Sequence, residues 1–267
     1  CRGMGGAELQ SLGLEQLVDP RHISATGLTE AAHAFLPTVR AYRTLSRALR
    51  TSNGVLLSDF PEVNLRLVAE AHKYKIPSVY LAPPQAWAWR PWRVSQLRQA
   101  NLVGCLFPFT KQWYAQRGVN ACWMGHPLAG AEPPKPRTSG AVCLMPGSRG
   151  RTVTQILPSM VALVNELQRR RVGVQFVCAR APDVPKAKLT EFFRRCQAHV
   201  AIVDDVEQAL ARSQMVIAHP GTATLHASLR GCSVLSLCDP SLLTKWVARR
   251  FLNLDSVVLP NILLGRA

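Results

Sequence analysis

The sequence has few acidic residues, no long apolar run and no closely paired cysteines. Its 267 residues include 32 lysines and arginines but 16 aspartates and glutamates, so the formal net charge is +16. This balance favours an anionic partner such as a phosphate, a nucleotide, a nucleic acid or an acidic membrane face. No apolar run approaches the ~18 residues of a membrane span, which argues against a transmembrane helix.

The eight cysteines form no C-x-x-C pair, so zinc binding has little support. Most, such as Cys143 and Cys178, lie in apolar, strand-like stretches where a buried free thiol is the ordinary state. Free thiols favour a reducing compartment, and we expect a cytoplasmic protein. The chain opens at Cys1 with neither an initiator methionine nor a signal peptide, so we expect a fragment of a longer protein.

Short β-branched runs alternate with helical stretches along the chain, and a proline-rich stretch at 132–140 is the best linker. The pattern predicts strands at 54–59, 77–81, 102–107, 141–145, 174–178, 215–218 and 234–237, and helices at 64–73, 153–171 and 224–230. Alternation on both sides of the linker predicts two doubly wound α/β domains, 1–132 and 133–267.

Two turns in the second half each follow a strand and open a helix. The first, P-G-S-R-G, contains Gly147, Ser148 and Arg149, and the second, H-P-G-T-A-T-L-H, contains Gly221 and Thr222. Such turns let backbone N–H groups approach an anion, and an arginine adds a bidentate contact to phosphate. Each alone could be an ordinary connection, with a solvated arginine in one and a threonine cap in the other. Together they predict a diphosphate-binding site.

The first half holds three further candidates. Asp59 ends a strand, where it is either a general base for a sugar hydroxyl or a cap of the next helix. The stretch A-P-P-Q-A-W-A-W-R at 82–90, followed by Trp92, forms either a ligand-binding aromatic wall or part of the domain's packing. His126 follows the last strand, at a hinge or cleft position.

The segment 31–50 has an amphipathic helical pattern. Its apolar side holds Phe35, Val39, Tyr42 and Leu49, and an adjacent basic stripe holds Arg40, Arg43, Arg47 and Arg50. This is typical of a helix on an anionic bilayer, or of a surface helix whose apolar side enters the core. A second such stretch at 242–252 strengthens the membrane interpretation.

Taken in order, these motifs resemble those of the bacterial lipid-A-disaccharide synthases. The matching stretches are 3–6, 59–64, 83–90, 106–109, 125–128, 146–149, 221–225 and 259–263. The W-A-W-R and L-P-N blocks are specific to that family, and the resemblance spans essentially the whole chain. It implies a glycosyltransferase fold of the GT-B type, with two Rossmann-like doubly wound domains and an interdomain cleft.

The resemblance also implies a reaction. The family joins UDP-2,3-diacylglucosamine to 2,3-diacylglucosamine 1-phosphate (lipid X), with inversion and release of UDP. It needs no metal and no cofactor, and it works at the anionic cytoplasmic face of the inner membrane of Gram-negative bacteria. In this scheme residues 1–132 form the acceptor and membrane-side domain, and residues 133–267 bind the UDP-sugar.

The resemblance carries roles onto individual residues. Asp59 matches the general base, and Arg149 the arginine that stabilises the leaving diphosphate. Gly147, Ser148, Gly221 and Thr222 match the turns at the nucleotide-sugar site, and Asn261 matches a donor-side residue. His226 stands where the family usually has Glu, and an imidazole offers a ribose hydroxyl at most one acceptor nitrogen. Phe35, Val39, Arg40, Arg43 and Arg47 are the membrane and acyl-chain contacts expected from the amphipathic segment.

Three alternatives stay open at this level. The chain could be a non-catalytic relative that binds nucleotide or anionic lipid, as His226 and the missing family termini would allow. It could be another UDP-sugar enzyme of the same fold, and it could form a homodimer. Nucleic-acid binding rests on net charge alone and lacks a recognisable module, so we expect no nucleic-acid partner.

Overall fold

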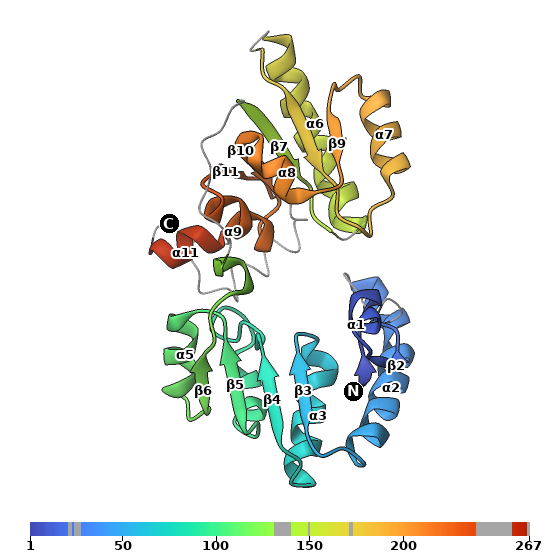
Figure 1. The fold of residues 1–267 in the computed structure, drawn as a ribbon, viewed down its shortest axis with the longest axis vertical. Coiled ribbons are helices and arrows are strands. Elements are labelled where there is room, and N and C mark those ends of the chain that lie inside the picture. Colours follow the sequence, from blue (N-terminus) through green and yellow to red (C-terminus); the bar gives the residue numbers. More distant parts are fainter. Residues whose placement is uncertain are drawn as a thin grey trace. The chain divides into compact units, whose positions relative to one another are not determined.

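The computed structural model describes residues 1–20, 23, 28–130, 140–148, 150–170, 173–238 and 258–265. The chain divides into two compact units, Cys1–Pro127 and Leu128–Ala267, called unit 1 and unit 2 below. Each unit is built on parallel strands with helices in the connections (Figure 1). The predicted linker at 132–140 lies outside the described residues except for Gly140, and the second amphipathic stretch at 242–252 lies wholly outside them.

Unit 1 begins with a small parallel pair and continues into a four-stranded parallel sheet. The pair consists of β1 (Arg2–Met4) and β2 (Glu15–Val18), with α1 (Ala7–Ser11) between them. The sheet has the order β3-β4-β5-β6, formed by β3 (Val55–Ser58), β4 (Ser78–Leu81), β5 (Leu102–Cys105) and β6 (Ala121–Trp123). Its helices are α2 (Leu28–Leu49), α3 (Pro61–Lys73), α4 (Val94–Leu97) and α5 (Pro108–Ala115), with a short 3-10 turn η2 (Pro91–Arg93). A second 3-10 turn, η3 (Pro127–Gly130), begins at the last residue of unit 1.

The core of unit 1 forms where the helices cover one face of this sheet. Leu57, Tyr80 and Val103 come from three adjacent strands and are almost fully buried. Helix α3 adds Val63 and Val68, which are fully buried in the same cluster. Fully burying a side chain of this size stabilises the fold by roughly 1.5–3 kcal/mol. This packing fixes α3, and with it the turn between β3 and α3.

A buried carboxylate joins α2 to α3. Glu70 accepts hydrogen bonds from Ser46 Oγ at 2.7 Å, Arg50 Nε at 2.9 Å and Tyr42 Oη at 3.1 Å. Burial by itself raises the pKa of Glu70, but the hydrogen bonds from Ser46, Arg50 and Tyr42 outweigh it, so the pKa lies below its usual value. The network therefore sets which side of α2 faces the core.

Unit 2 is a five-stranded parallel sheet with helices on both faces (Figure 1). Its strands are β7 (Ala141–Met145), β8 (Phe176–Ala179), β9 (Ala201–Val203), β10 (Ser213–Ala218) and β11 (Ser233–Ser236), in the order β11-β10-β7-β8-β9. Its helices are α6 (Gly150–Arg169), α7 (Lys186–Arg195), α8 (Val206–Ala211), α9 (Thr222–Leu229) and α11 (Leu259–Leu264).

Strand residues of unit 2 alternate between two cores. Val142 and Leu144 of β7 face a cluster with α6 and α7, while Cys143 and Met145 face a cluster with α8 and α9. All of β7 is buried, as expected for a central parallel strand. Buried positions of α6 recur at a helical spacing, and Pro158 lies within the helix without ending it.

The predicted strands and helices within the described residues are confirmed, with ends displaced by a few residues. The predicted fold class of parallel α/β domains is also confirmed. Several short elements were not predicted: β1, α1, β2, α4, α5, β6, α7, β9, α8 and α11. Among the described residues, no helix is both long and apolar enough to cross a membrane. The same residues contain no cluster of three or more histidine, cysteine or acidic side chains suited to a metal ion.

The Glu70 network generates a prediction about pH. Because the pKa of Glu70 is lowered on folding, its contribution is complete above the unfolded value of ~4.3 and is lost as the pH falls through the folded value. We expect Glu70→Gln to lower the free energy of unfolding by about 1.5–3 kcal/mol at pH 7, and by less at acidic pH. Urea titrations from pH 7 to pH 3, followed by tryptophan fluorescence, measure this. Glu191→Gln, in an exposed pair with Arg194, is the control and should change little. A loss in Glu70→Gln that does not shrink with acid would contradict the prediction.

Candidate functional site

The strand order of unit 2 changes direction at its centre. From β7 the chain moves outward through β8 and β9, and then returns to the other side of β7 as β10 and β11. In open parallel sheets, ligands bind at the carboxyl ends of the strands where the order reverses. This places the expected site between the ends of β7 and β10, which are hydrogen-bonded neighbours.

A cavity of about 570 Å³ lies at this edge of the sheet. Its volume is in the range of ordinary small-molecule sites. Segments following four strands line it: Met145, Gly147, Ser148 and Thr152 after β7, Ala179–Pro182 after β8, Asp204 and Val206 after β9, and His219–Ala223 after β10. Four of the predicted nucleotide-site residues, Gly147, Ser148, Gly221 and Thr222, are therefore brought together.

The turn after β7 needs glycine. Gly147 has a φ of +107°, and a Cβ built there would lie 3.3 Å from Cγ2 of Thr152. The backbone can therefore approach closely here, as a phosphate-binding turn requires. Ser148 is exposed beside it, and Arg149, the predicted partner of the leaving diphosphate, lies outside the described residues.

The turn after β10 also needs glycine. Gly221 has a φ of +149° and precedes the first residue of α9, Thr222, which is exposed. No side chain among the described residues caps this helix, so the alternative of a threonine cap is wrong. Thr224 instead donates its hydroxyl to the Gly221 carbonyl at 2.7 Å. The uncapped N–H groups at the start of α9 are suited to an anion.

Three polar side chains that line the cavity, those of Arg180, Asp204 and His219, make hydrogen bonds with neighbouring groups. Arg180 donates to Asp204 with 2.6 Å between Nε and Oδ1, and this hydrogen bond holds the pKa of Asp204 below its usual value. His219 Nδ1 lies 2.9 Å from the Pro220 carbonyl. Because a carbonyl oxygen only accepts, Nδ1 carries a proton and donates.

His226 belongs to an ionic cluster that the sequence did not predict. It lies one helical turn after Thr222, on the same side of α9. Its Nε2 contacts Glu207 of α8 at 2.8 Å, and Arg230 donates to both oxygens of the same carboxylate at 2.6 and 2.7 Å. Hydrogen bonds from Arg230 and then His226 lower the pKa of Glu207, against the effect of its burial. A carboxylate is therefore present beside position 226, supplied by a different helix.

The remaining donor-side candidate lies on the last described helix. Asn261 is half-buried in α11, which packs against α9. Asn261 does not line the cavity at the ends of β7 and β10. Its predicted role stays a prediction.

The carboxyl edge of the unit 1 sheet presents Asp59. This residue and Phe60 both have left-handed backbones, with φ of 50° and 46°, and the Asp59 side chain is exposed. Helix α3 begins after Phe60 without a side-chain cap among the described residues, so the alternative of Asp59 as a cap is wrong. The carboxylate contacts no described basic side chain within ion-pair distance.

Ion pairs join this turn to the tryptophan-rich loop after β4. Glu62 contacts Arg93 at 2.7 Å and Arg90 at 3.8 Å. Further along the edge, the rings of Trp87 and Phe109 meet edge-to-face at 5.0 Å. Both rings are partly exposed, and the predicted aromatic wall stays a prediction.

His126 lies next to the boundary between the units and stacks on Phe107 at 5.4 Å. Burial lowers the pKa of this imidazole below its usual value. Its neutral form is therefore favoured at pH 7.

Helix α2, the predicted amphipathic segment, has one face packed in the core and one face exposed to solvent, as an ordinary surface helix does. Tyr42 and Leu49 pack with the unit 1 core, Val39 is half-buried, and the side chain of Phe35 lies outside the described ones. The side chains of Arg40, Arg43 and Arg47 are exposed, and Leu36 beside them is 64% exposed.

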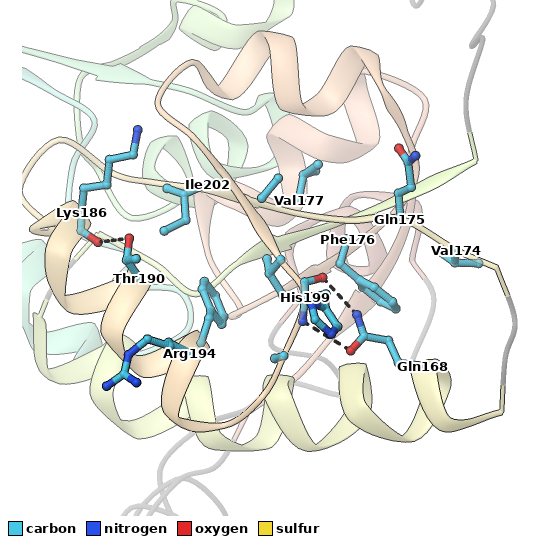
Figure 2. Close-up of a pocket in the computed structure, with 14 residues that line it drawn as sticks. Gln168, Val174, Gln175, Phe176, Val177, Lys186, Thr190, Arg194, His199 and Ile202 are labelled. Atoms are coloured by element: carbon cyan, nitrogen blue, oxygen red, sulfur yellow. Dashed lines mark hydrogen bonds between the residues drawn. The ribbon is translucent and has the colours of Figure 1, made fainter.

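A second hollow, of about 840 Å³, lies at the amino ends of β8 and β9 (Figure 2). Gln168 and His199 meet there through two hydrogen bonds, drawn as dashed lines in Figure 2. No predicted site residue lines it, and it lies at the end of the strands opposite to the one that binds ligands in such sheets. We therefore place the functional site at the smaller cavity.

Sequence reasoning missed Thr152, Arg180 and Asp204 as parts of the cavity lining, and it missed Glu207 as the partner of His226. Arg180 and Asp204 each follow directly after a strand, the same signal that identified Asp59. Asp204 was missed because the strand at 201–203 was not predicted, and Arg180 was missed because the predicted strand at 174–178 ends one residue before β8 does.

The parallel α/β units define the fold class as GT-B, and solved structures of that class are similar. A UDP co-structure of S. aureus MnaA has a TM-score of 0.59 and 11% identity over 99% of this chain and 85% of that one. A UDP-GlcNAc 2-epimerase from Neisseria meningitidis has a TM-score of 0.57 and 14% identity over 96% and 78%. At such identities the likeness shows the fold alone, and the predicted GT-B class is confirmed.

The sequence comparisons identify the family within that class. The family described as lipid-A-disaccharide synthetase matches residues 1–267. The lipid-A-disaccharide synthases of Anaeromyxobacter dehalogenans (strain 2CP-C) and Myxococcus xanthus (strain DK1622) are 33% and 31% identical, over 99% of this chain and 73% of each relative. The chain belongs to the lipid-A-disaccharide synthetase family, and it is a glycosyltransferase.

The cluster at His226 generates a prediction. Replacing His226 with glutamate, the residue that the family resemblance leads us to expect there, would place two carboxylates in contact, because Glu207 already contacts position 226. We expect His226→Glu to lower the free energy of unfolding by about 1 kcal/mol, and Glu207→Gln in that background to recover most of it. Thermal unfolding of both variants, followed by circular dichroism, measures this. A stabilised His226→Glu variant would contradict the contact between α8 and α9.

Proposed function

We propose that this glycosyltransferase joins UDP-2,3-diacylglucosamine to lipid X and releases UDP. The observation that carries the proposal is the pair of glycine turns at one sheet edge, Gly147 and Gly221, both at positive φ and both lining one cavity. Membership of the family supports the choice of substrates. UDP occupies the related fold of S. aureus MnaA, which supports a UDP-sugar as donor.

The proposed transfer proceeds in one displacement. Asp59 takes the proton of the acceptor hydroxyl, whose oxygen bonds to the anomeric carbon of the donor sugar. The bond from that carbon to the diphosphate breaks, and its electron pair leaves with UDP. Attack from the face opposite the leaving group inverts the anomeric configuration.

Charge on the leaving diphosphate is stabilised by fixed donors. The N–H groups at the start of α9 and the turn at Gly147 and Ser148 form the described part of this site. Arg149 follows directly in the sequence and supplies a bidentate cationic contact. In this proposal helix ends and arginines perform the stabilisation that a metal ion performs in other transferases, and no cofactor takes part.

The ribose lies against His226 in this proposal. The Nε2 atom of His226 already contacts Glu207, so the Nδ1 atom of His226 and the carboxylate of Glu207 bind the ribose hydroxyls. Asn261, on the helix that packs against α9, contacts the donor sugar.

Acyl substrates are collected at a bilayer in this proposal. Arg40, Arg43 and Arg47 are exposed along one helix, and Leu36 is exposed beside them. Cationic side chains with apolar neighbours bind an anionic membrane surface. Phe35 and Val39 add apolar contacts, and the protein works peripherally at the cytoplasmic face of the inner membrane.

The nucleotide site is tested by a matched pair of glycine variants. Gly221→Ala forces a side chain into a backbone shape that only glycine adopts readily, at about 1–3 kcal/mol, so we expect at least about tenfold weaker UDP binding and less transfer. Gly231→Ala strains the other end of α9, at φ 70°, and should lower stability without weakening UDP binding. Calorimetric titration with UDP and a transfer assay with both lipid substrates measure this. Equal UDP affinity in the two variants would contradict the site, and UDP binding by the unaltered chain without transfer would indicate a non-catalytic relative.

The membrane surface is tested by charge reversal. Arg40, Arg43 and Arg47 together changed to Glu should release the protein from anionic vesicles, because each arginine near such a surface contributes ~1 kcal/mol. Added salt should release the unaltered protein partially. Lys111, Lys188 and Arg195 changed to Glu make the control, since they are exposed and give the same change in net charge. Vesicle sedimentation that is the same for both triple variants would show that α2 is an ordinary surface helix.

A further inference from the structure

We propose that Tyr80 and Asn64 are positioning residues for Asp59, which hold the turn between β3 and α3 in the shape that presents the Asp59 carboxylate. The proposal rests on the general-base role given to Asp59 above. The experiment below lets the base role and the positioning role fail separately.

The turn is strained in two successive residues. Asp59 and Phe60 have φ of 50° and 46°, in the left-handed region that residues other than glycine rarely occupy. Such a backbone persists only where surrounding contacts enforce it, and such strain gathers at functional sites. Contacts that enforce this turn are therefore of functional interest.

Two buried donors converge on one carbonyl oxygen of the turn. Tyr80 Oη donates to the Asp59 carbonyl at 2.6 Å, and Asn64 Nδ2 donates to the same oxygen at 2.7 Å. Asn64 Nδ2 also donates to the Ser58 carbonyl at 3.0 Å, the last carbonyl of β3. Tyr80 is 0% exposed and Asn64 is 4% exposed, so neither donor has water as a substitute partner.

The two donors come from elements that the core holds rigidly. Tyr80 lies on β4 in register with Leu57, and both side chains belong to the buried cluster of unit 1. Asn64 lies in the first turn of α3, between the buried residues Val63 and Leu65. The peptide of Asp59 is thus fixed from the neighbouring strand and from the following helix at once.

The Asp59 carboxylate has no such support of its own. It is exposed, and it makes no hydrogen bond or ion pair with the side chains that the structure describes. Its direction is therefore set by its backbone, and its backbone by Tyr80 and Asn64. A small displacement of a catalytic group can lower the rate by as much as about 100-fold.

A merely structural role would look different in kinetics. A buried tyrosine hydroxyl needs a partner wherever it lies, as Tyr114 shows by donating to the Pro84 carbonyl. Removing such a hydroxyl lowers stability but affects turnover by the same factor whether or not Asp59 can act as a base. A positioning residue loses its effect on turnover once the base is gone.

The test is a double-mutant cycle on the transfer reaction in mixed micelles. Asp59→Asn keeps the shape of the side chain but cannot take the proton, and Tyr80→Phe removes only the hydroxyl. We expect Tyr80→Phe alone to lower kcat by about 10-fold to 100-fold, with KM for the donor and UDP affinity nearly unchanged. In the Asp59→Asn background the same change should lower kcat by less than about twofold.

Two further variants provide a second test and a control. Asn64→Ala removes the second donor and should show the same non-additivity, even if Tyr80→Phe folds poorly. Tyr42→Phe removes a hydroxyl that donates to Glu70 at 3.1 Å, away from the turn, and should leave kcat unchanged.

The outcomes separate the two roles. Asp59→Asn with nearly full activity would overturn the base role itself. Asp59→Asn with a large loss, together with a Tyr80→Phe effect that is absent or equal in both backgrounds, would overturn the positioning role alone. Loss of kcat in Tyr80→Phe and Asn64→Ala that vanishes in the Asp59→Asn background would support it.

Discussion

The parallel direction of the strands is the constraint on which both candidate sites depend. It collects the turn that follows each strand at one edge of its sheet, whatever the distance along the chain. In unit 2 it sets the turns at Gly147 and Gly221 side by side, because β7 and β10 are neighbours in the sheet although two other strands separate them in sequence. In unit 1 it aligns Asp59, the tryptophan-rich loop and His126 along one edge.

Among the helices whose first turn the structure describes, α8 alone begins with a side-chain cap. Helix α8 has an ordinary cap, in which Asp205 accepts from the N–H groups of Glu207 at 2.8 Å and Gln208 at 3.4 Å. Helices α3 and α9 begin at Phe60 and Gly221 with no side-chain cap among the described residues. A side-chain cap stabilises a helix by ~1 kcal/mol, so both helices give up stability that α8 keeps. Helices α1, α4, α5, α7 and α11 also begin without a side-chain cap, so the two candidate turns are marked by the positive φ of Gly221 and the left-handed backbones of Asp59 and Phe60, and not by the missing cap.

Acidic residues are few in this chain, and most described ones in helices and strand ends are bound to arginine. Glu62, Glu70, Glu166, Glu191, Asp204 and Glu207 each lie in an ion pair. Asp59 forms none with the described residues, although the chain carries twice as many basic as acidic side chains. An exposed carboxylate left unpaired in so basic a protein remains available to accept a proton. Arg40, Arg43 and Arg47 of α2 are the complementary case, since they are exposed and form no ion pair with the described residues, while Arg50, directly after the helix, pairs with Glu70.

The parts of the site that could be predicted from sequence are those encoded by local order. A strand, a glycine turn and a helix follow one another at 141–150 and at 213–222, so the two turns and their residues were within reach. The roles of Tyr80 and Asn64 could not be predicted from the sequence, because their contact with Asp59 depends on backbone angles that no local pattern specifies.

His226 is a second residue whose surroundings the local sequence does not specify. From the sequence alone, His226 places an imidazole where the family resemblance leads us to expect a carboxylate. In the structure, the carboxylate of Glu207, 19 residues earlier on α8, lies 2.8 Å from that ring. The chemistry available at position 226 is therefore a property of two helices, and a change at that position can be judged only together with its partner.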